Sequence, residues 1–301
     1  MNGPINLLFG LLGSAGGTPW VPPAPEPLPA PVDYAHRPEP YDRFIAKLRP
    51  TLEVAKVFRV GPNRTYSTIS AAVSAATRFQ QAFPDVPWCD IVIDPGDYRA
   101  GESPCHSIQN IGFYSSSGEP NSVIWHAGLD YARLSFYLEG IFLDARQASG
   151  PKYSIHAGGG ATAVLVGSTL TYSASGIYPV GTDGASGGYF GFYDCDLIGR
   201  NDTAFTNQHQ SLDAATAPFV QVFVKTRFPG GMFRFHGMNW GQADELWVID
   251  SSGRAATLVG TDNPDAVFAV SGSVFSGSGV APVKEAVDRR DWPLPQWKVG
   301  A

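Results

Sequence analysis

Residues 57–98 read VFRVGPNRTYSTISAAVSAATRFQQAFPDVPWCDIVIDPGDY, and this stretch decides the fold. Its middle predicts a helix, because Ser67 or Thr68 can serve as the N-cap and apolar residues then recur at i, i+3, i+4 and i+7. Those apolar positions are Ile69, Ala72, Val73 and Ala76. A β-branched strand, CDIVI at 89–93, follows and runs into the turn residues DPGD at 94–97. The stretch is therefore a strand, a capped amphipathic helix and a second strand.

This order of segments resembles the opening of the pectin-lyase-like β-helix superfamily, and most closely its pectin methylesterase branch. The matching residues are Tyr66–Ile69 (YSTI) and Ile93–Tyr98 (IDPGDY). The resemblance implies an all-β chain folded as a single-stranded, right-handed parallel β-helix, a solenoid with a short N-terminal capping helix. The resemblance does not indicate a particular activity, because lyases, esterases, glycosidases and non-catalytic phage-tail stalks share such an opening.

Between about residue 100 and residue 280 the chain repeats a strand-and-turn pattern, as a solenoid requires. Six segments align so that one column contains Gly140, Gly167, Asp194, Lys225, Asp250 and Gly272. Alternation within these strands predicts one core-facing side. The residues expected there are Phe136, Leu138, Val164, Val166, Phe190, Phe192, Val222, Val224, Phe268 and Val270.

The chain divides into three parts. Residues 1–50 form a proline-rich N-terminal arm for assembly, residues 51–281 form the β-helix, and residues 282–301 form a C-terminal cap with an extended tail. The tail contains two tryptophans, Trp292 and Trp297. The sequence allows them either to pack against the chain's own coils or to contact a partner subunit. The residues of the arm expected to mediate assembly are Ile5, Leu7, Leu8, Phe9 and Trp20.

Composition narrows the function classes. Of the 301 residues only 16% are charged, the net charge is -6 and glycine occurs 34 times, which suits short strands joined by tight turns and disfavours nucleic-acid binding. The first 17 residues contain a short apolar run without a Lys or Arg before it, so neither an export signal nor a membrane span is expected. The three cysteines, Cys89, Cys105 and Cys195, have no metal-site spacing and are expected as buried thiols, although pairing of Cys89 with Cys105 is open in a secreted chain.

One stretch, residues 193–205 (YDCDLIGRNDTAF), resembles the methylesterase pattern C-x-I-x-G-x-Q-D-T-L-Y. Under a catalytic hypothesis the candidate residues are Asp194, Asp196, Arg200 and Asp202. In the family, the aspartate matching Asp202 is a general acid/base that works with a nucleophilic aspartate one coil later. Here that later coil reads FVKTRFPG (residues 223–230) and has no carboxylate, so ester hydrolysis is not expected. The carboxylates are expected as turn and surface residues.

No cofactor or metal ion is expected, because the six histidines show neither an H-x-H nor an H-E-x-x-H spacing. Glycan-binding residues are unassigned. Several aromatic residues either stack on sugar rings or pack between coils: Tyr172, Tyr178, Tyr189, Trp240 and Trp247.

These observations favour a non-catalytic structural virion protein of a tailed bacteriophage, a minor tail or decoration protein located on the particle. It docks to other virion proteins through residues 1–50, associates with itself, most simply as a homotrimer, and contacts host-surface polysaccharide. Two alternatives stay open. One is a polysaccharide-active glycosidase, lyase or esterase, and the other is an extracellular, glycan-binding adhesin.

Overall fold

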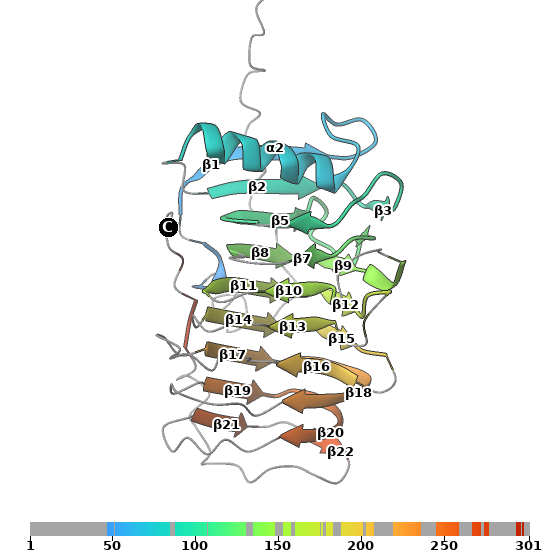
Figure 1. Ribbon diagram of the computed structural model, residues 1–301, viewed down its shortest axis with the longest axis vertical. Coiled ribbons are helices and arrows are strands. Elements are labelled where there is room, and N and C mark those ends of the chain that lie inside the picture. The colour runs from blue at the N-terminus through green and yellow to red at the C-terminus, as the bar shows by residue number, and fades with distance from the viewer. Residues whose placement is uncertain are drawn as a thin grey trace, which may run out of the picture. The chain divides into compact units, whose positions relative to one another are not determined.

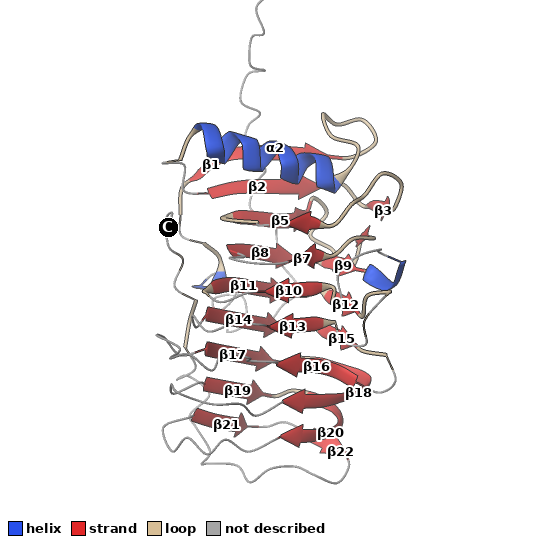
Figure 2. Cartoon of the chain, viewed as in Figure 1, coloured by secondary structure: helices blue, strands red, loops and turns tan. Residues whose placement is uncertain are grey.

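A computed structural model describes the chain over residues 47–50, 52–84, 88–106, 108–130, 135–147, 153–157, 160–174, 176, 179–182, 188–200, 203–207, 219–235, 245–258, 267–271, 274–276, 293–295 and 297. Parallel strands in these residues form a β-solenoid, with one helix across its first strands (Figures 1 and 2). The structure thus shows the mostly β, parallel solenoid that the repeat pattern predicts.

The first sheet, sheet A, contains nine parallel strands stacked in chain order. They are β1 (Val54–Val60), β2 (Trp88–Ile93), β5 (Ile111–Ser115), β8 (Ser135–Glu139), β11 (Ala161–Val166), β14 (Gly188–Tyr193), β17 (Phe219–Val224), β19 (Glu245–Ile249) and β21 (Val267–Ser271).

Two further sheets complete the coils. Sheet B contains β3 (Gly96–Tyr98), β6 (Val123–Trp125), β9 (Ile141–Leu143), β12 (Thr169–Thr171), β15 (Asp196–Ile198), β18 (Arg227–Phe235), β20 (Ser252–Leu258) and β22 (Val274–Ser276), with β16 (Thr203–Asn207) pairing β18. Sheet C contains β4 (Cys105–His106), β7 (Leu129–Asp130), β10 (Ile155–Ala157) and β13 (Val180–Thr182). The chain passes from sheet A to sheet B to sheet C and then begins the next coil (Figure 1).

Five turns from sheet A to sheet B, those that follow β8, β11, β14, β17 and β19, share one backbone conformation. Each contains a residue with φ between 48° and 70°, the left-handed region that glycine adopts most easily. These residues are Gly140, Gly167, Asp194, Lys225 and Asp250. They are five members of the column aligned from the sequence, and that alignment is confirmed for them; the sixth, Gly272, lies outside the described residues.

The predicted core is right for half of its described members. Phe136, Leu138, Phe190 and Phe192 lie in the interior cluster. Val164, Val166, Val222 and Val224 lie on the opposite face of sheet A, because Leu165 pairs with Leu138 and Val166 with Glu139. The sequence misled here because sheet A is apolar on both faces, so alternation between apolar and polar residues does not mark the interior. The side chains of Phe268 and Val270 lie outside the described part of the chain.

Segments from both ends of the solenoid sequence cover the outer face of sheet A. Its buried cluster includes Trp88, Tyr193 and Leu48 from the segment before β1. Trp297, from the tail, packs its ring 5.2 Å from that of Trp88 and donates from Nε1 to the carbonyl of Leu48 at 3.0 Å. Trp297 is therefore packed against its own chain, at β2; Trp292 lies outside the described residues.

The helix α2 (Ile69–Ala82) lies across the N-terminal end of the stack (Figure 1). Thr68 is its N-cap and accepts from the Ala71 N–H at 3.2 Å, as the sequence predicts. Glu102, from the loop after β3, accepts from the N–H groups of Ile69 and Ser70 at 2.6 and 3.0 Å. A carboxylate at this end is favoured by the helix dipole. The predicted apolar face is buried against the interior cluster.

The cysteines are buried and unpaired, as expected for core thiols. Burial raises the pKa of Cys105 to about 12, so its thiol stays protonated near neutral pH. The expected assembly residues of the arm, from Ile5 to Trp20, lie outside the described residues.

Candidate functional site

The predicted catalytic candidates are only partly brought together. Asp194 in the A-to-B turn and Asp196 on β15 both contact one residue, Arg227 on β18. Arg227 Nε and Nη2 donate to the two oxygens of Asp196 at 2.6 and 3.0 Å, and Nη1 donates to Asp194 Oδ1 at 3.2 Å. These hydrogen bonds raise the pKa of Arg227.

This geometry gives the two aspartates a structural role. Asp194 occupies a left-handed turn position, which Asp tolerates better than most side chains. The oxygens of Asp194 and Asp196 accept the hydrogen bonds of the Arg227 guanidinium, which holds both carboxylates in place. Arg200 lies elsewhere, stacked over the Tyr172 ring at 4.7 Å. Asp202 lies outside the described residues.

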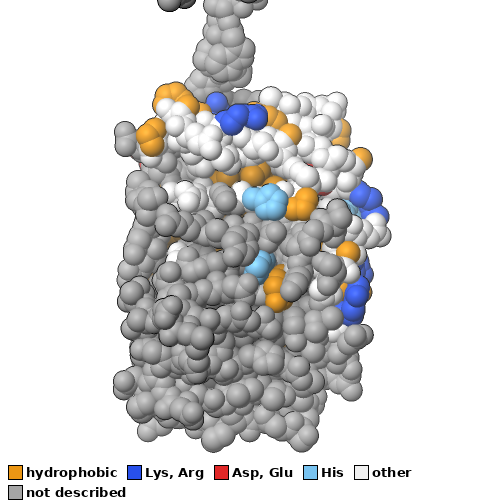
Figure 3. All heavy atoms as spheres, viewed as in Figure 1, with side chains coloured by type: hydrophobic (Ala, Val, Ile, Leu, Met, Phe, Trp, Pro, Cys, Tyr) orange, Lys and Arg blue, Asp and Glu red, His pale blue; other side chains and the backbone are white. Residues whose placement is uncertain are grey.

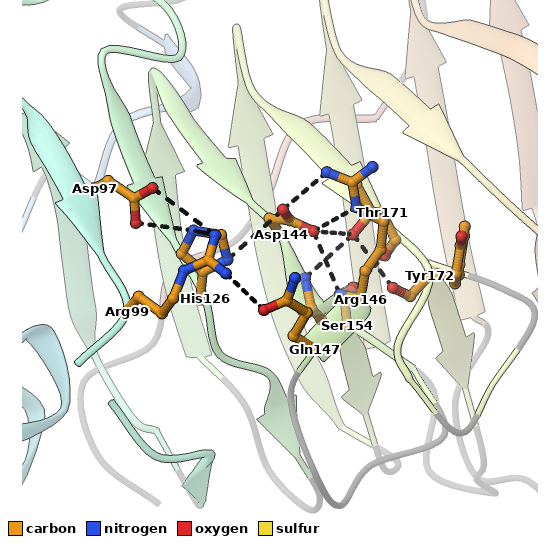
Figure 4. Close-up of polar contacts among 10 residues, drawn as sticks. Asp97, Arg99, His126, Asp144, Arg146, Gln147, Ser154, Thr171 and Tyr172 are labelled. Carbon is orange, nitrogen blue, oxygen red and sulfur yellow. Dashed lines mark hydrogen bonds and ion pairs between the residues drawn. The ribbon is translucent and has the colours of Figure 1, made fainter. Parts of the chain in front are cut away.

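A second polar cluster lies where sheet B strands end and the chain turns toward sheet C (Figure 4). His126 directly follows β6 and Asp144 directly follows β9; β6 and β9 are neighbours in the sheet. Asp97 belongs to β3, on the other side of β6. Parallel register therefore brings together three residues that are far apart in the sequence.

His126 is the buried centre of this cluster, with a side chain only 4% exposed. Its Nε2 lies 2.9 Å from Asp97 Oδ1 and 3.3 Å from Arg99 Nη2. Its Nδ1 faces Asp144 Oδ2 at 3.6 Å and has no hydrogen-bond partner among the described groups. The imidazole thus lies between two carboxylates, one from the coil before it and one from the coil after it.

Asp144 is buried, and its carboxylate is held by several hydrogen bonds. It accepts from Arg146 Nε and Nη2 at 2.7 and 2.8 Å and from Thr171 Oγ1 at 3.2 Å. Burial works against ionisation of Asp144, but the Arg146 hydrogen bonds outweigh it and lower the pKa of the carboxyl. Asp144 is therefore a fixed anion near neutral pH.

Three arginines, Arg99, Arg146 and Arg200, follow sheet B strands on alternate coils, and we refer to them as the arginine strip. Arg99 and Arg146 have side chains 53% and 48% exposed. Arg99 Nη1 donates to Gln147 at 2.6 Å, so this guanidinium is positioned by a neighbour two coils away. Blue side chains, which are those of Lys and Arg, lie along one edge of the surface in Figure 3. The strip combines solvent access with oriented N–H donors, which suits carboxylate recognition.

The sequence did not reveal this cluster, because its members have no local spacing. A coil-by-coil alignment of the sheet B strands could have found it. In the register of that sheet, one column contains Arg99, His126, Asp144 and Thr171. Of the aromatic candidates, Tyr189 and Trp247 are packed in the outer cluster of sheet A and Tyr172 is half-buried under Arg200. Tyr178 and Trp240 are not among the described residues.

Among the described side chains, no group of three or more His, Cys, Asp or Glu is arranged to hold a metal ion. The helices of the described part are too short or too polar to cross a membrane.

Comparisons with protein families, with curated proteins and with solved structures find no match to this chain.

Proposed function

We propose that this chain is a non-catalytic structural component of a tailed-bacteriophage particle whose solenoid contacts acidic polysaccharide on the host surface. The observation that carries the binding role is the arginine strip: guanidiniums on alternate coils of the stack, with the side chains of Arg99 and Arg146 about half exposed. Neighbouring parallel strands are about 4.8 Å apart, so the strip repeats about every 10 Å. A linear polymer with regularly spaced carboxylates meets such a repeat several times, and weak contacts then add up.

The contacts of Asp194 and Asp196 support the non-catalytic part of the proposal. Both carboxylates are committed to Arg227, and the strand of the next coil supplies no carboxylate nucleophile. Hydrolysis by a carboxylate pair needs one group to attack and another to move a proton. We therefore assign the two salt-bridged aspartates to stabilising the turn and not to catalysis.

The assembly part of the proposal is supported by the sequence. The proline-rich arm, residues 1–50, has an apolar tip at Ile5–Phe9, which suits docking onto other virion proteins or onto copies of this chain. A trimer is the self-association we expect.

The test is binding of the full chain to polygalacturonate, hyaluronate and alginate by calorimetry, with neutral dextran as a control and product release assayed in parallel. We expect saturable binding to at least one acidic polymer, weakened by salt, with no product. The variant R99Q/R200Q should bind at least about 10-fold more weakly, while K47Q/R78Q, which removes two exposed charges elsewhere, should bind like the native chain.

Two results would overturn the proposal in different ways. Equal binding by R99Q/R200Q and the native chain, or no binding to any acidic polymer, removes the glycan-contact role. Product release that disappears in D194N/D196N or in D202N establishes the alternative, a polysaccharide-active enzyme.

A further inference from the structure

One ring nitrogen of His126 lies between a hydrogen-bond acceptor and a hydrogen-bond donor (Figure 4). Its Nε2 is 2.9 Å from Asp97 Oδ1, a carboxylate oxygen that accepts, and 3.3 Å from Arg99 Nη2, a guanidinium nitrogen that only donates. Nε2 with a proton donates to Asp97, and Nε2 without one accepts from Arg99. No single protonation state of His126 therefore satisfies both neighbours.

The other ring nitrogen faces a second carboxylate. His126 Nδ1 lies 3.6 Å from Asp144 Oδ2 and has no hydrogen-bond partner among the described groups. Arg146 donates two hydrogen bonds to Asp144 and holds it in place. Among the described side chains, the charged groups around the ring are thus Asp97 and Arg99 on one side and Asp144, with its partner Arg146, on the other.

The imidazolium form of His126 suits the two carboxylates but not the arginine. A doubly protonated ring presents one N–H to Asp97 and one to Asp144, whereas each neutral tautomer leaves a lone pair facing a carboxylate oxygen. The imidazolium Nε2 does not accept from Arg99, and two cationic groups are then in contact. Protonation of His126 therefore ties the ring to the carboxylates and removes one contact of Arg99.

Arg99 stays positioned when this contact is lost. Its Nη1 donates to Gln147 Oε1 at 2.6 Å, and Gln147 does not titrate. The Arg99 side chain is about half exposed, so a carboxylate from solvent has access to it. The guanidinium is thus held through one nitrogen while the other becomes available to a ligand.

We propose that His126 is a positioning residue that makes polysaccharide binding by the arginine strip pH-dependent. Protonation of His126 releases Arg99 Nη2 and adds a positive charge beside the strip, so the strip binds an acidic polymer more tightly at low pH. The inference rests on the proposed binding function of the strip. Histidine is the side chain whose charge ordinarily changes between about pH 5 and pH 8, where carboxyl groups of a polymer are ionised.

The test is calorimetric titration of the full chain with polygalacturonate at about pH 5.5 and about pH 7.5, at one ionic strength. We expect the native chain to bind at least about 3-fold more tightly at the lower pH. H126Q, which replaces the ring with a polar side chain that does not titrate, should lose most of this difference. H106Q, which removes an exposed histidine of sheet C, should keep the native ratio of affinities.

A second measurement needs no polysaccharide and separates this inference from the proposed function. The guanidinium NMR signals of Arg99, assigned by their absence in R99Q, should shift between about pH 5 and pH 8 in the native chain and not in H126Q. Shifting Arg99 signals in a chain that binds no acidic polymer would support the coupling of His126 to Arg99 and reject the binding role.

The inference is overturned if the Arg99 signals do not depend on His126, or if native chain and folded H126Q show the same ratio of affinities. Far-UV circular dichroism and urea midpoints show whether H126Q folds. For the case that it does not, D97N changes an exposed side chain and should lower the native ratio, because an amide does not stabilise the imidazolium. A folded D97N chain with the native ratio would contradict the inference as well.

Discussion

The outer face of sheet A and the turns that follow sheet B differ in what covers them. On sheet A, Trp88 and its neighbours are sealed by Leu48 and Trp297, so this face is a second hydrophobic core. After sheet B, Asp97, Arg99 and Arg146 reach solvent around a buried histidine. One face of the solenoid is therefore covered by other segments of the chain, while the region where the sheet B strands end keeps charged side chains in contact with solvent.

The largest expected loss of stability comes from a substitution in the covered outer face of sheet A. Trp88→Ala removes a fully buried ring packed on Trp297, and it should lower the free energy of unfolding by about 3–5 kcal/mol. Ile124→Ala, at a half-buried outer position of β6, should cost about 1 kcal/mol. Urea unfolding followed by circular dichroism measures both. Similar costs for the two variants would mean that the faces are not energetically distinct.

The next effect concerns the buried anion of the polar cluster. Arg146→Gln leaves the Asp144 carboxylate without its charged partner, which should cost about 1–2 kcal/mol because the exposed half of Arg146 is screened by solvent. Asp144→Asn in the same chain should restore most of the loss. Arg99→Gln should change stability by less than about 0.5 kcal/mol, because its partners Asp97 and Gln147 are exposed and the buried His126 Nε2 keeps Asp97 Oδ1 at 2.9 Å. Urea midpoints that are lower for Arg99→Gln than for Arg146→Gln would contradict this ranking.

The two faces should respond to pH with opposite signs. Burial raises the pKa of Asp90, on the outer face of sheet A, to about 6, opposed by the hydrogen bond from Trp88 Nε1 at 2.9 Å. The folded state then binds more protons than the unfolded state between about pH 4 and pH 6, so the stability due to Asp90 is lost as pH rises through that window. For Asp144 the folded pKa is lowered, and its contribution is present above the unfolded pKa and lost as pH falls.

Urea midpoints between pH 3 and pH 8 test this pair of signs. Asp90→Asn should remove a decrease of about 1–2 kcal/mol between pH 4 and pH 6, because Asn still accepts from Trp88 but does not titrate. Asp144→Asn should instead flatten the loss of stability below about pH 4. Slopes of the same sign from both variants would show that Asp90 and Asp144 occupy equivalent environments.

The smallest effect lies in the turns that connect sheet A to sheet B. Lys225 has φ of 50°, and replacing it with glycine relieves backbone strain while increasing the entropy of the unfolded chain. Lys225→Gly should stabilise the protein by about 0.5 kcal/mol in thermal or urea unfolding. Lys47→Gly, at an exposed helical position, should instead be neutral or destabilising. A destabilised Lys225→Gly chain would mean that the lysine side chain contributes more than its backbone costs.

Local sequence predicted the helix and the turns well. Thr68 is the expected helix cap, and the aligned turn residues from Gly140 to Asp250 have positive φ, because capping and left-handed turns depend on the residue type at one position. The face of each strand was harder to predict. Val166 and Leu165 are both buried, and only the pairing with β8 shows which of them lies inside.

The polar cluster around His126 could not be predicted from local spacing. His126 meets Asp97 and Asp144 because β3, β6 and β9 stack in register. The candidates chosen by motif, Asp194 and Asp196, instead proved to be salt-bridged by Arg227.

The sequence by itself determined the solenoid, its capping helix and the short turns between sheets A and B, because periodicity, capping and turn conformation are properties of neighbouring residues. Only the tertiary structure decided which strand face is the interior, which segments seal sheet A and which charged residues meet. Those outcomes depend on contacts between coils, and the register of a parallel stack sets such contacts among residues that the sequence separates by a whole coil.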